Sequence, residues 1–255
     1  MTPKLWDAHV HLDFMANAAE AARQAALMDM GLLAVTVTPR DYLRYLPELG
    51  NIPNVCLAVG LHPWWIADGR CDMEDAALAA DLARKIRFVG EIGLDASPKH
   101  VPDGSLGKQI RAFELICEGC AEGSGAAAPK VLSLHSVKAA EQTLDVLERT
   151  GCLNACRCVF HWFTGSNEAL TRAVKAGCLF SVNEMMLRTR RGREYARQIP
   201  EDRLLLETDM PPGRDIPFQA ETVRDSLDRV LAGLREIRGK DMDAIIQRNT
   251  ENIFP

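Results

Sequence analysis

Long apolar runs are missing from this sequence of 255 residues, and so is any excess of positive charge. No stretch approaches the ~20 apolar residues that a membrane-spanning helix requires, so we expect no membrane-embedded segment. The formal net charge of −5 excludes a general nucleic-acid coat protein, and a polyanion would have to be held by a local basic patch or by metal. The first residues lack the basic and apolar regions of a signal peptide, which favours a cytoplasmic location.

A disulfide scaffold is not expected either, although the chain has eight cysteines. A chain of this length has enough apolar residues to form a core without one. One alternative is a structural zinc site that joins Cys117 and Cys120 to Cys152, Cys156 and Cys158. The C-x-x-C and C-x-x-x-C-x-C spacings do not match a standard pair of zinc knuckles, so the simpler interpretation is scattered reduced thiols.

Eight short apolar runs alternate with segments of helical periodicity. The runs resemble parallel strands buried on both faces and occupy residues 5–11, 32–38, 55–62, 88–94, 131–135, 158–163, 179–183 and 204–209. Apolar residues three and four positions apart predict helices over residues such as 16–30, 78–86, 109–122, 139–149 and 167–176, and a last helix over 241–253. This alternation over residues 1–255 predicts a single-domain α/β protein, a (β/α)8 barrel of the TIM type.

Most of the histidines, together with two carboxylates, lie at or near the ends of the predicted strands. These residues are His9, His11, His62, Glu91, His135, His161 and Asp209. The C-terminal ends of parallel strands meet at one face of a barrel, and that face carries the active site. His100, in an irregular loop, is the one histidine outside this pattern.

Six of these residues are predicted to bind divalent metal: His9, His11, Glu91, His135, His161 and Asp209. His9 and His11 are two positions apart, so on a strand they face the same side. Four imidazoles and two carboxylates are more ligands than one tetrahedral zinc ion needs, whereas two ions that share Glu91 would use them all. The ligand set does not distinguish among Zn²⁺, Mn²⁺ and Mg²⁺.

The predicted charge of the site indicates its chemistry. Two divalent ions against two carboxylates leave about +2, which favours an anionic substrate, and paired ions about 3.5–4 Å apart suit phosphoryl transfer. We expect Glu91 and Asp209 to be catalytic, with Asp209 orienting the attacking water. Glu207 is two residues before Asp209 and is expected to orient a ligand histidine.

Substrate contacts are predicted from residues that follow the strands. His62 either contacts substrate or caps a loop. Arg188, Arg190 and Arg191 follow the seventh run and are expected to bind flanking phosphates, although a solvated helix face explains them equally well. The aromatic side chains that follow strand ends, and that either stack on exposed bases or pack at the rim, are Trp64, Trp65, Trp162 and Phe163.

Seven short motifs together resemble the TatD family of metal-dependent deoxyribonucleases. They are DAHVHLD at 7–13, GLHP at 60–63, GEIGLD at 90–95, LHS at 134–136, HWFTGS at 161–166, LETD at 206–209 and NTEN at 249–252. The resemblance runs through most of the chain. It implies a TIM-type barrel, divalent metals, and hydrolysis of phosphodiester bonds in DNA, with single strands or ends as the expected substrate.

The chain departs from the usual TatD pattern at positions expected to contact substrate. Ala96 stands where a tyrosine is common, the fifth-strand histidine is followed by residues 136–138 without an arginine, and the basic segment after Asp209 is reduced to residues 210–214. The segments EIGLDASP at 91–98, HWFTGS at 161–166 and FSVN at 180–183 are similar to the TatD-like subunit of Qat anti-phage defence systems. That similarity implies partner proteins in a defence complex.

Two other functions are compatible with the sequence. One is an amidohydrolase-type barrel that cuts a C–N or C–O bond, as a deaminase, lactonase or deacylase does. Many such enzymes bridge their metals with a carboxylated lysine, whereas this chain offers Glu91 at the fourth strand and has Lys99 far into the following loop. The other is a weakly active subunit that serves the assembly of a defence complex.

Overall fold

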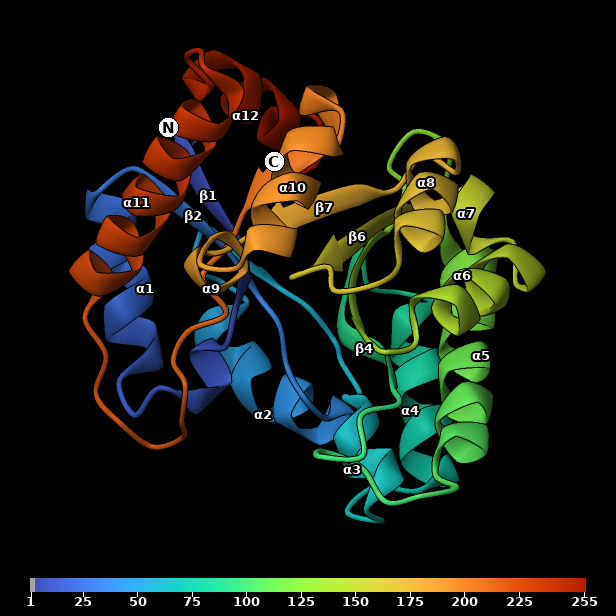
Figure 1. Ribbon diagram of the computed structural model, residues 1–255. Helices are drawn as coiled ribbons and strands as arrows, with labels where there is room; N and C mark the ends of the chain where they lie inside the picture. The colour runs from blue at the N-terminus through green and yellow to red at the C-terminus, as the bar shows by residue number, and fades with distance from the viewer. Residues whose placement is uncertain (1–2) are drawn as a thin grey trace.

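A computed structural model describes residues 3–255 and shows eight parallel strands that alternate with helices (Figure 1). The strands are β1 Leu5–Val10, β2 Met30–Ala34, β3 Val55–Leu57, β4 Phe88–Asp95, β5 Val131–Val137, β6 Arg157–His161, β7 Leu179–Val182 and β8 Leu204–Leu206. They pair in the orders β1-β2-β3 and β4-β5-β6-β7-β8, and every pairing is parallel. This is the predicted (β/α)8 architecture.

Backbone hydrogen bonds join the two sheets into a closed barrel. Between β3 and β4, the Gly90 N–H donates to the Val59 carbonyl at 2.8 Å. Between β8 and β1, the Asp209 N–H donates to the His9 carbonyl at 2.9 Å, and the Thr208 N–H donates to the Asp7 carboxylate at 3.0 Å. The second junction, which we call the seam, brings together segments from opposite ends of the chain.

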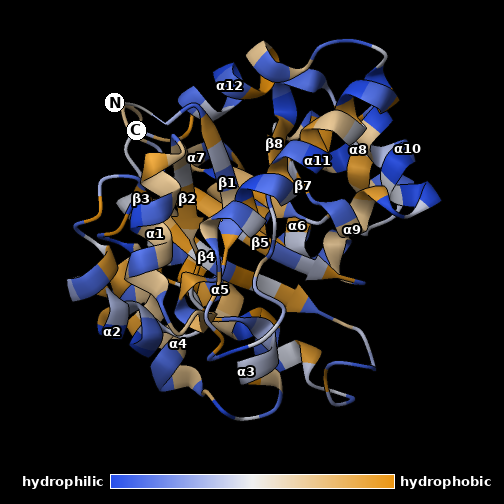
Figure 2. Ribbon diagram, turned by 90° about the vertical axis from the view of Figure 1, so that its left-hand side faces the viewer, coloured by the Kyte–Doolittle hydropathy of each residue, from blue (hydrophilic) through white to orange (hydrophobic). Residues whose placement is uncertain are grey.

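Helices surround the barrel. They are α1 Ala18–Leu27, α2 Pro39–Leu49, α3 Pro63–Ala67, α4 Met73–Ala83, α5 Leu106–Gly123, α6 Ala140–Arg149, α7 Cys152–Ala155, α8 Asn167–Lys175, α9 Glu184–Leu187, α10 Arg190–Gln198, α11 Ala220–Arg238 and α12 Asp243–Glu251, with short 3-10 turns at Leu12–Phe14 and Glu201–Arg203. Figure 2 shows the apolar colour on the strands and the polar colour on the helix surfaces that face outward. Among residues 3–255, no helix combines the length and the hydrophobicity that crossing a membrane requires.

An apolar cluster fills the base of the barrel. It contains residues from seven strands, including Val131 of β5 and Val159 of β6, and Phe88 of β4 packs against it. Trp6 stacks on Phe254 there at a ring distance of 4.3 Å. Side chains alternate along a strand, so Val131 and His135 face the same side, as do Val159 and His161. The packed base therefore supports a layer of polar side chains at the C-terminal ends of the strands.

Six of the eight strands end earlier than the sequence predicted, β1, β3 and β8 among them. β1 ends at Val10, β3 ends at Leu57, and β8 ends at Leu206. Asp209 lies three residues beyond β8 and has a φ of 58°. Because that left-handed conformation is incompatible with a strand, Asp209 and Glu207 are not related by simple strand alternation, as the sequence analysis assumed.

The cysteines are buried and free. Cys117 and Cys120 lie on α5, Cys152 on α7, and Cys156 and Cys158 follow it. Burial raises the pKa of the Cys117 thiol to about 11. The groups of potential metal ligands found among residues 3–255 contain no cysteine. The structure therefore describes these cysteines as buried free thiols.

Candidate metal centre

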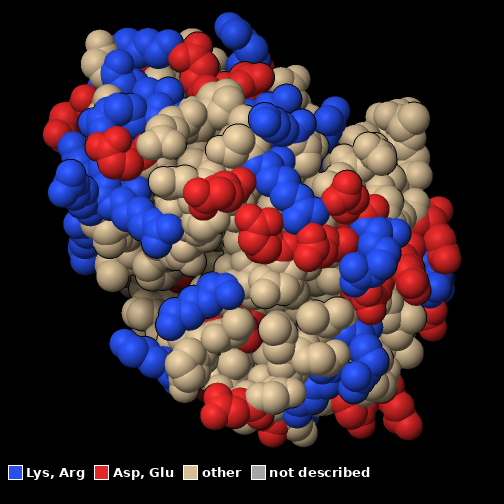
Figure 3. Space-filling model, turned by 45° about the vertical axis from the view of Figure 1, so that its right-hand side comes forward, with Lys and Arg blue, Asp and Glu red and all other residues tan. Residues whose placement is uncertain are grey.

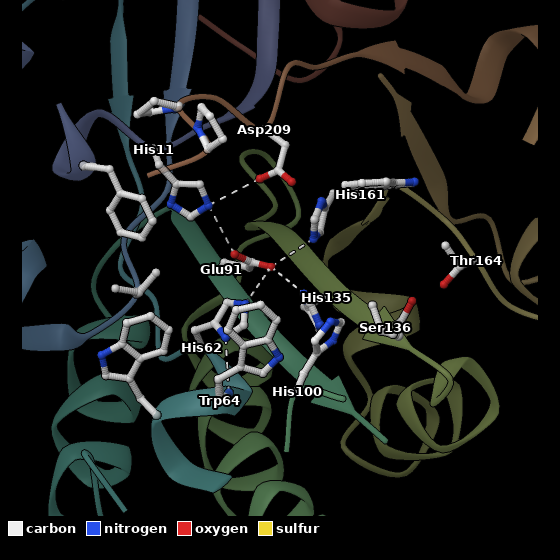
Figure 4. A pocket seen from close by; sticks show the side chains of 17 residues that line it. His11, His62, Trp64, Glu91, His100, His135, Ser136, His161, Thr164 and Asp209 are labelled. Atoms are coloured by element: carbon white, nitrogen blue, oxygen red, sulfur yellow. Dashed lines mark hydrogen bonds and ion pairs between the residues drawn. The ribbon is translucent and has the colours of Figure 1, made fainter. Parts of the chain in front are cut away.

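The six predicted ligands meet at the C-terminal end of the barrel, and Figure 4 shows five of them, all except His9. They come from β1, β4, β5 and β6 and from the segments after β1 and β8: His9, His11, Glu91, His135, His161 and Asp209. Five of them are buried, and Asp209 keeps 25% of its side chain exposed. Residues spread over 200 positions of sequence are thus held by the rigid ends of the barrel strands.

Glu91 lies at the centre, and its two oxygens face different histidines. Oε2 is 3.6 Å from His9 Nε2 and 3.4 Å from His11 Nε2. Oε1 is 2.7 Å from His135 Nδ1 and 2.9 Å from His161 Nε2. One carboxylate therefore separates two groups of nitrogen donors.

Asp209 completes the first group of donors. Its Oδ1 atom is 3.6 Å from His9 Nε2 and 3.5 Å from His11 Nε2. These separations exceed hydrogen-bond length, but they match ligands around one ion. Two donors about 2.0–2.1 Å from a tetrahedral zinc ion lie about 3.4 Å apart.

A second observation, the environment of the His9 ring, also fits a divalent metal ion at this site. His9 Nε2 is buried and lacks a hydrogen-bond partner among the described residues. An orphaned buried nitrogen is costly in a folded protein unless it serves a ligand. The His9 ring is fixed from its other side, where Nδ1 lies 2.7 Å from Ser133 Oγ. A hydrogen bond from Nδ1–H to that hydroxyl leaves the lone pair on Nε2, as metal ligation requires.

The structure shows the capping role of His62, and its contact with substrate stays a prediction. Its Nδ1 accepts a hydrogen bond from the Trp64 N–H at 3.2 Å and so caps α3. Its Nε2 is 3.3 Å from Glu91 Oε1, inside the site. A neutral imidazole that accepts at Nδ1 carries its proton on Nε2. His62 therefore presents a donor to the cavity rather than a metal-binding lone pair.

Glu207 supports the histidine of β6. Its Oε1 atom is 3.8 Å from His161 Nδ1 and accepts a hydrogen bond from Asn183 Nδ2 at 2.8 Å. The Ser181 hydroxyl and the Trp162 N–H also donate to Glu207. The structure places Glu207 behind a ligand histidine, the position from which it was predicted to act.

Asp95 has a comparable role that the sequence analysis missed. Its Oδ2 atom is 3.0 Å from His135 Nε2 and accepts a hydrogen bond from Trp64 Nε1 at 2.7 Å. Burial alone would raise the pKa of Asp95, but hydrogen bonds from His135, Trp64 and the Ser97 N–H outweigh it and lower the pKa to about 2. The signal was present: Asp95 lies four residues after Glu91 on the same strand and hence on the same face.

Asp7, also missed, lies at the seam. Its Oδ1 accepts hydrogen bonds from the N–H groups of His9 and Thr208, and its Oδ2 lies 2.5 Å from the Thr208 hydroxyl. Burial raises the pKa of this carboxyl to about 8, and nearby Glu207 adds to the rise. Asp7 is therefore largely protonated near neutral pH, and it holds the backbone of His9 in place.

The carboxylates of the site favour the protonated form of two of its histidines. Burial lowers the pKa of His11, but Asp13, Asp209 and Glu91 outweigh this effect and raise the pKa well above its usual value. His161 behaves in the same way through Glu91 and Glu207. Both imidazoles thus carry protons at neutral pH when no cation is present.

Metal loading near pH 7 is expected to release protons. A raised pKa means that His11 and His161 are protonated at this pH, and ligation requires the neutral imidazole. Metal affinity should therefore rise with pH through this range. Calorimetric titrations in buffers of different ionisation enthalpy give the number of protons released, and a value of zero would contradict the proposed ligands.

A cavity of about 510 Å³ opens above Glu91. Aromatic, apolar and polar side chains line it: His11, Phe14, Val37, His62, Trp64, Trp65, Glu91, His100, His135, Ser136, Val137, His161, Trp162, Thr164, Asp209, Pro211 and Pro212. Trp162 lines it, as expected of a residue that contacts substrate. Phe163, by contrast, is buried against Phe160 and Phe180 in the core.

The three predicted arginines lie elsewhere. The described residues that line the cavity include none of Arg188, Arg190 and Arg191. Arg191 donates to the Tyr195 hydroxyl at 2.7 Å and to the Gly165 carbonyl at 2.8 Å, so it joins α10 to the loop after β6. Any contact between these arginines and substrate would involve a polymer that extends beyond the cavity.

Comparison with known proteins gives a consistent result. The family model described as TatD related DNase matches residues 6–255. An uncharacterized metal-dependent hydrolase of Escherichia coli, YcfH, is 27% identical over 97% of this chain and 93% of its own. Human deoxyribonuclease TATDN3 is 24% identical over 67% of this chain and 61% of its own. The crystal structure of the E. coli TatD homolog YJJV covers 100% of this chain and 99% of its own, with a TM-score of 0.78 and 23% identity.

The family match spans nearly the whole chain, and the structure brings together a buried set of histidines and carboxylates that can hold metal. The YJJV structure shares the barrel over its full length. The chain therefore belongs to the TatD-related DNase family of metal-dependent hydrolases.

Proposed function

We propose that this protein is a divalent-metal-dependent nuclease that hydrolyses phosphodiester bonds in DNA. The observation that carries the proposal is the position of Glu91 between two groups of donors, which suits a pair of cations. His9, His11 and Asp209 would hold one cation, His135 and His161 the other, and Glu91 would contact both. Bound divalent cations supply Lewis acidity, which stabilises charge on the phosphoryl group and makes water a nucleophile near neutral pH.

The side chains of the site orient the reactants. Asp209, the most exposed of the predicted ligands, can accept a hydrogen bond from the attacking water at the floor of the cavity. His62 can donate from Nε2 to a phosphoryl oxygen. Preorganised donors of this kind are effective because the surrounding walls exclude water.

The shape and lining of the cavity support a nucleic-acid substrate. Its volume lies within the roughly 300–1,000 Å³ of small-molecule sites, which is enough for a terminal nucleotide but not for a duplex. Trp64, Trp65 and Trp162 offer aromatic surface on which bases can stack. At the rim, the Arg214 guanidinium lies 4.2 Å from the centre of the Phe14 ring, where it can meet a neighbouring phosphate. We therefore favour single strands and ends as substrates.

A substrate panel tests the proposal. Metal-free protein would be loaded with Mg²⁺, Mn²⁺ or Zn²⁺ and offered end-labelled single-stranded DNA, duplex DNA, RNA, and a set of carboxylic esters, lactones and amides. We expect metal-dependent cleavage of single-stranded DNA that chelation abolishes. Turnover of an ester, lactone or amide without any cleavage of DNA would instead support an amidohydrolase, and no turnover at all would support an assembly role.

A further inference from the structure

His100 lies in the cavity although its position in the sequence, in an irregular loop, gave no sign of this. Its side chain is 40% exposed and lines the cavity beside Ser136. Its Nδ1 atom is 3.2 Å from Asp95 Oδ2, the atom that also holds His135. His100 thus shares a buried carboxylate with a predicted metal ligand without itself being placed to bind the same cation.

The loop that carries His100 is anchored at both sides. The Ser97 N–H donates to Asp95 Oδ1 at 2.6 Å, and the His100 N–H donates to the Ser97 carbonyl at 2.9 Å. The Trp64 ring lies 4.9 Å from the His100 ring and donates to the same carboxylate. These contacts fix the imidazole in a defined position at the wall of the cavity.

The contact with Asp95 determines which ring nitrogen can act. An ionised carboxylate only accepts hydrogen bonds, so the proton on Nδ1 points to Asp95 and Nε2 is left to exchange a proton with a ligand. A carboxylate behind a histidine also holds the ring in one orientation, as it does behind the histidines of hydrolase triads. Nε2 of His100 is therefore the ring nitrogen that can transfer a proton to a bound ligand.

The position of His100 relative to Asp209 suggests which proton it carries. In Figure 4, His11 and Asp209 lie on one side of Glu91, whereas His100 and His135 lie on the other. In-line displacement at phosphorus places the attacking and leaving oxygens on opposite sides. A water oriented by Asp209 would attack from the first side, so the leaving oxygen would depart towards the second.

We propose that His100 is the general acid that protonates the leaving oxygen, an inference that rests on the proposed nuclease function. The water oxygen forms a bond to phosphorus, the bond from phosphorus to the sugar oxygen breaks, and that oxygen takes the proton from Nε2 of the His100 imidazolium. Asp209 accepts a proton from the attacking water. The exposed edge of His100 recovers its proton from solvent. The hydroxyls of Ser136 and Thr164, which also line the cavity, are too weakly acidic for this task.

Leaving-group dependence tests the assignment. Bis(4-nitrophenyl) phosphate releases a stable phenolate that needs no proton, whereas a thymidine dinucleotide releases an alkoxide that does. His100→Asn keeps a donor where Nδ1 meets Asp95 and removes Nε2. We expect kcat on the dinucleotide to fall by about 10²-fold or more, and kcat on the nitrophenyl diester to stay within about threefold, because general acid catalysis contributes typically 10²–10⁴-fold. Lys99→Gln, a change to the adjacent exposed residue, should affect neither.

A second measurement does not depend on turnover. Nitrogen-15 spectra of the histidine rings should show His100 protonated at Nδ1, and a ring protonated only at Nε2 would overturn the assignment. Equal losses on the two substrates, or no loss on either, would also overturn it. If the wild-type protein hydrolyses neither diester, the proposed nuclease function itself fails. If the wild-type protein hydrolyses both and the His100→Asn variant hydrolyses them equally well, only the role of His100 fails.

Discussion

Glu91→Gln should weaken the binding of metal at both groups of donors. The substitution keeps the shape of the side chain, but it removes the charge and turns one oxygen into an amide nitrogen that cannot ligate. Because Oε2 faces His9 and His11 while Oε1 faces His135 and His161, either orientation of the amide damages one group directly. We expect the loss of kcat to exceed the roughly 100-fold that changes outside the ligand set typically cost.

Metal analysis of the dialysed protein measures this effect, with Glu207→Gln as the matched control. Glu207 is an equally buried glutamate, but it contacts His161 only through Nδ1, on the side away from Glu91. Its replacement should lower metal affinity by about 10–100-fold and leave the stoichiometry unchanged at saturation. A single tightly bound ion that is unaffected by Glu91→Gln would contradict the bridge.

Asp209→Asn is expected to lower kcat by more than about 10²-fold, the lower end of what general base catalysis contributes. Asparagine retains one oxygen near His9 and His11, so part of the metal affinity should survive. What it lacks is the charge that accepts a proton from water. Single-turnover kinetics at saturating metal separates this loss from weakened binding of the metal.

Asp7→Asn is the matched control for Asp209→Asn. Asp7 has a pKa of about 8, so near pH 7 it is largely neutral and asparagine copies its protonated form. The amide oxygen can accept from the His9 and Thr208 N–H groups, and the amide nitrogen can donate to the Thr208 hydroxyl. Activity should change little. If Asp209→Asn kept normal turnover while Glu207→Gln lost it, the roles given to these two carboxylates would have to be exchanged.

The fold and the clustering of the candidate ligands could be predicted from the sequence because both leave periodic signals. The apolar runs marked the eight strands, and the strand ends marked His9, Glu91, His135 and His161. Prediction from strand periodicity failed for residues that lie beyond the end of a strand. Asp209 was placed on β8, but it follows β8 with a left-handed backbone, and its approach to His9 depends on the seam.

His100 shows what periodicity cannot reveal. A histidine in a loop has no strand register from which its position can be predicted. The contact between His100 and Asp95 depends instead on a turn stabilised by Ser97. For the arginines after β7 the contact with substrate stays a prediction, since Arg191 is bound to Tyr195 and Gly165 and none of the three lines the cavity. The choice of DNA as substrate and the partner proteins of a defence complex stay predictions.

The seam also imposes an order of assembly on the enzyme. Asp7 and Thr208 are 201 residues apart in sequence, and the hydrogen bonds between them hold His9 beside Asp209. Contacts of such long range form late because a large loop must close before they contribute. A partly folded chain would already contain every histidine of the centre and still lack its first group of donors. We therefore expect any hydrolysis at this centre to require the closed barrel.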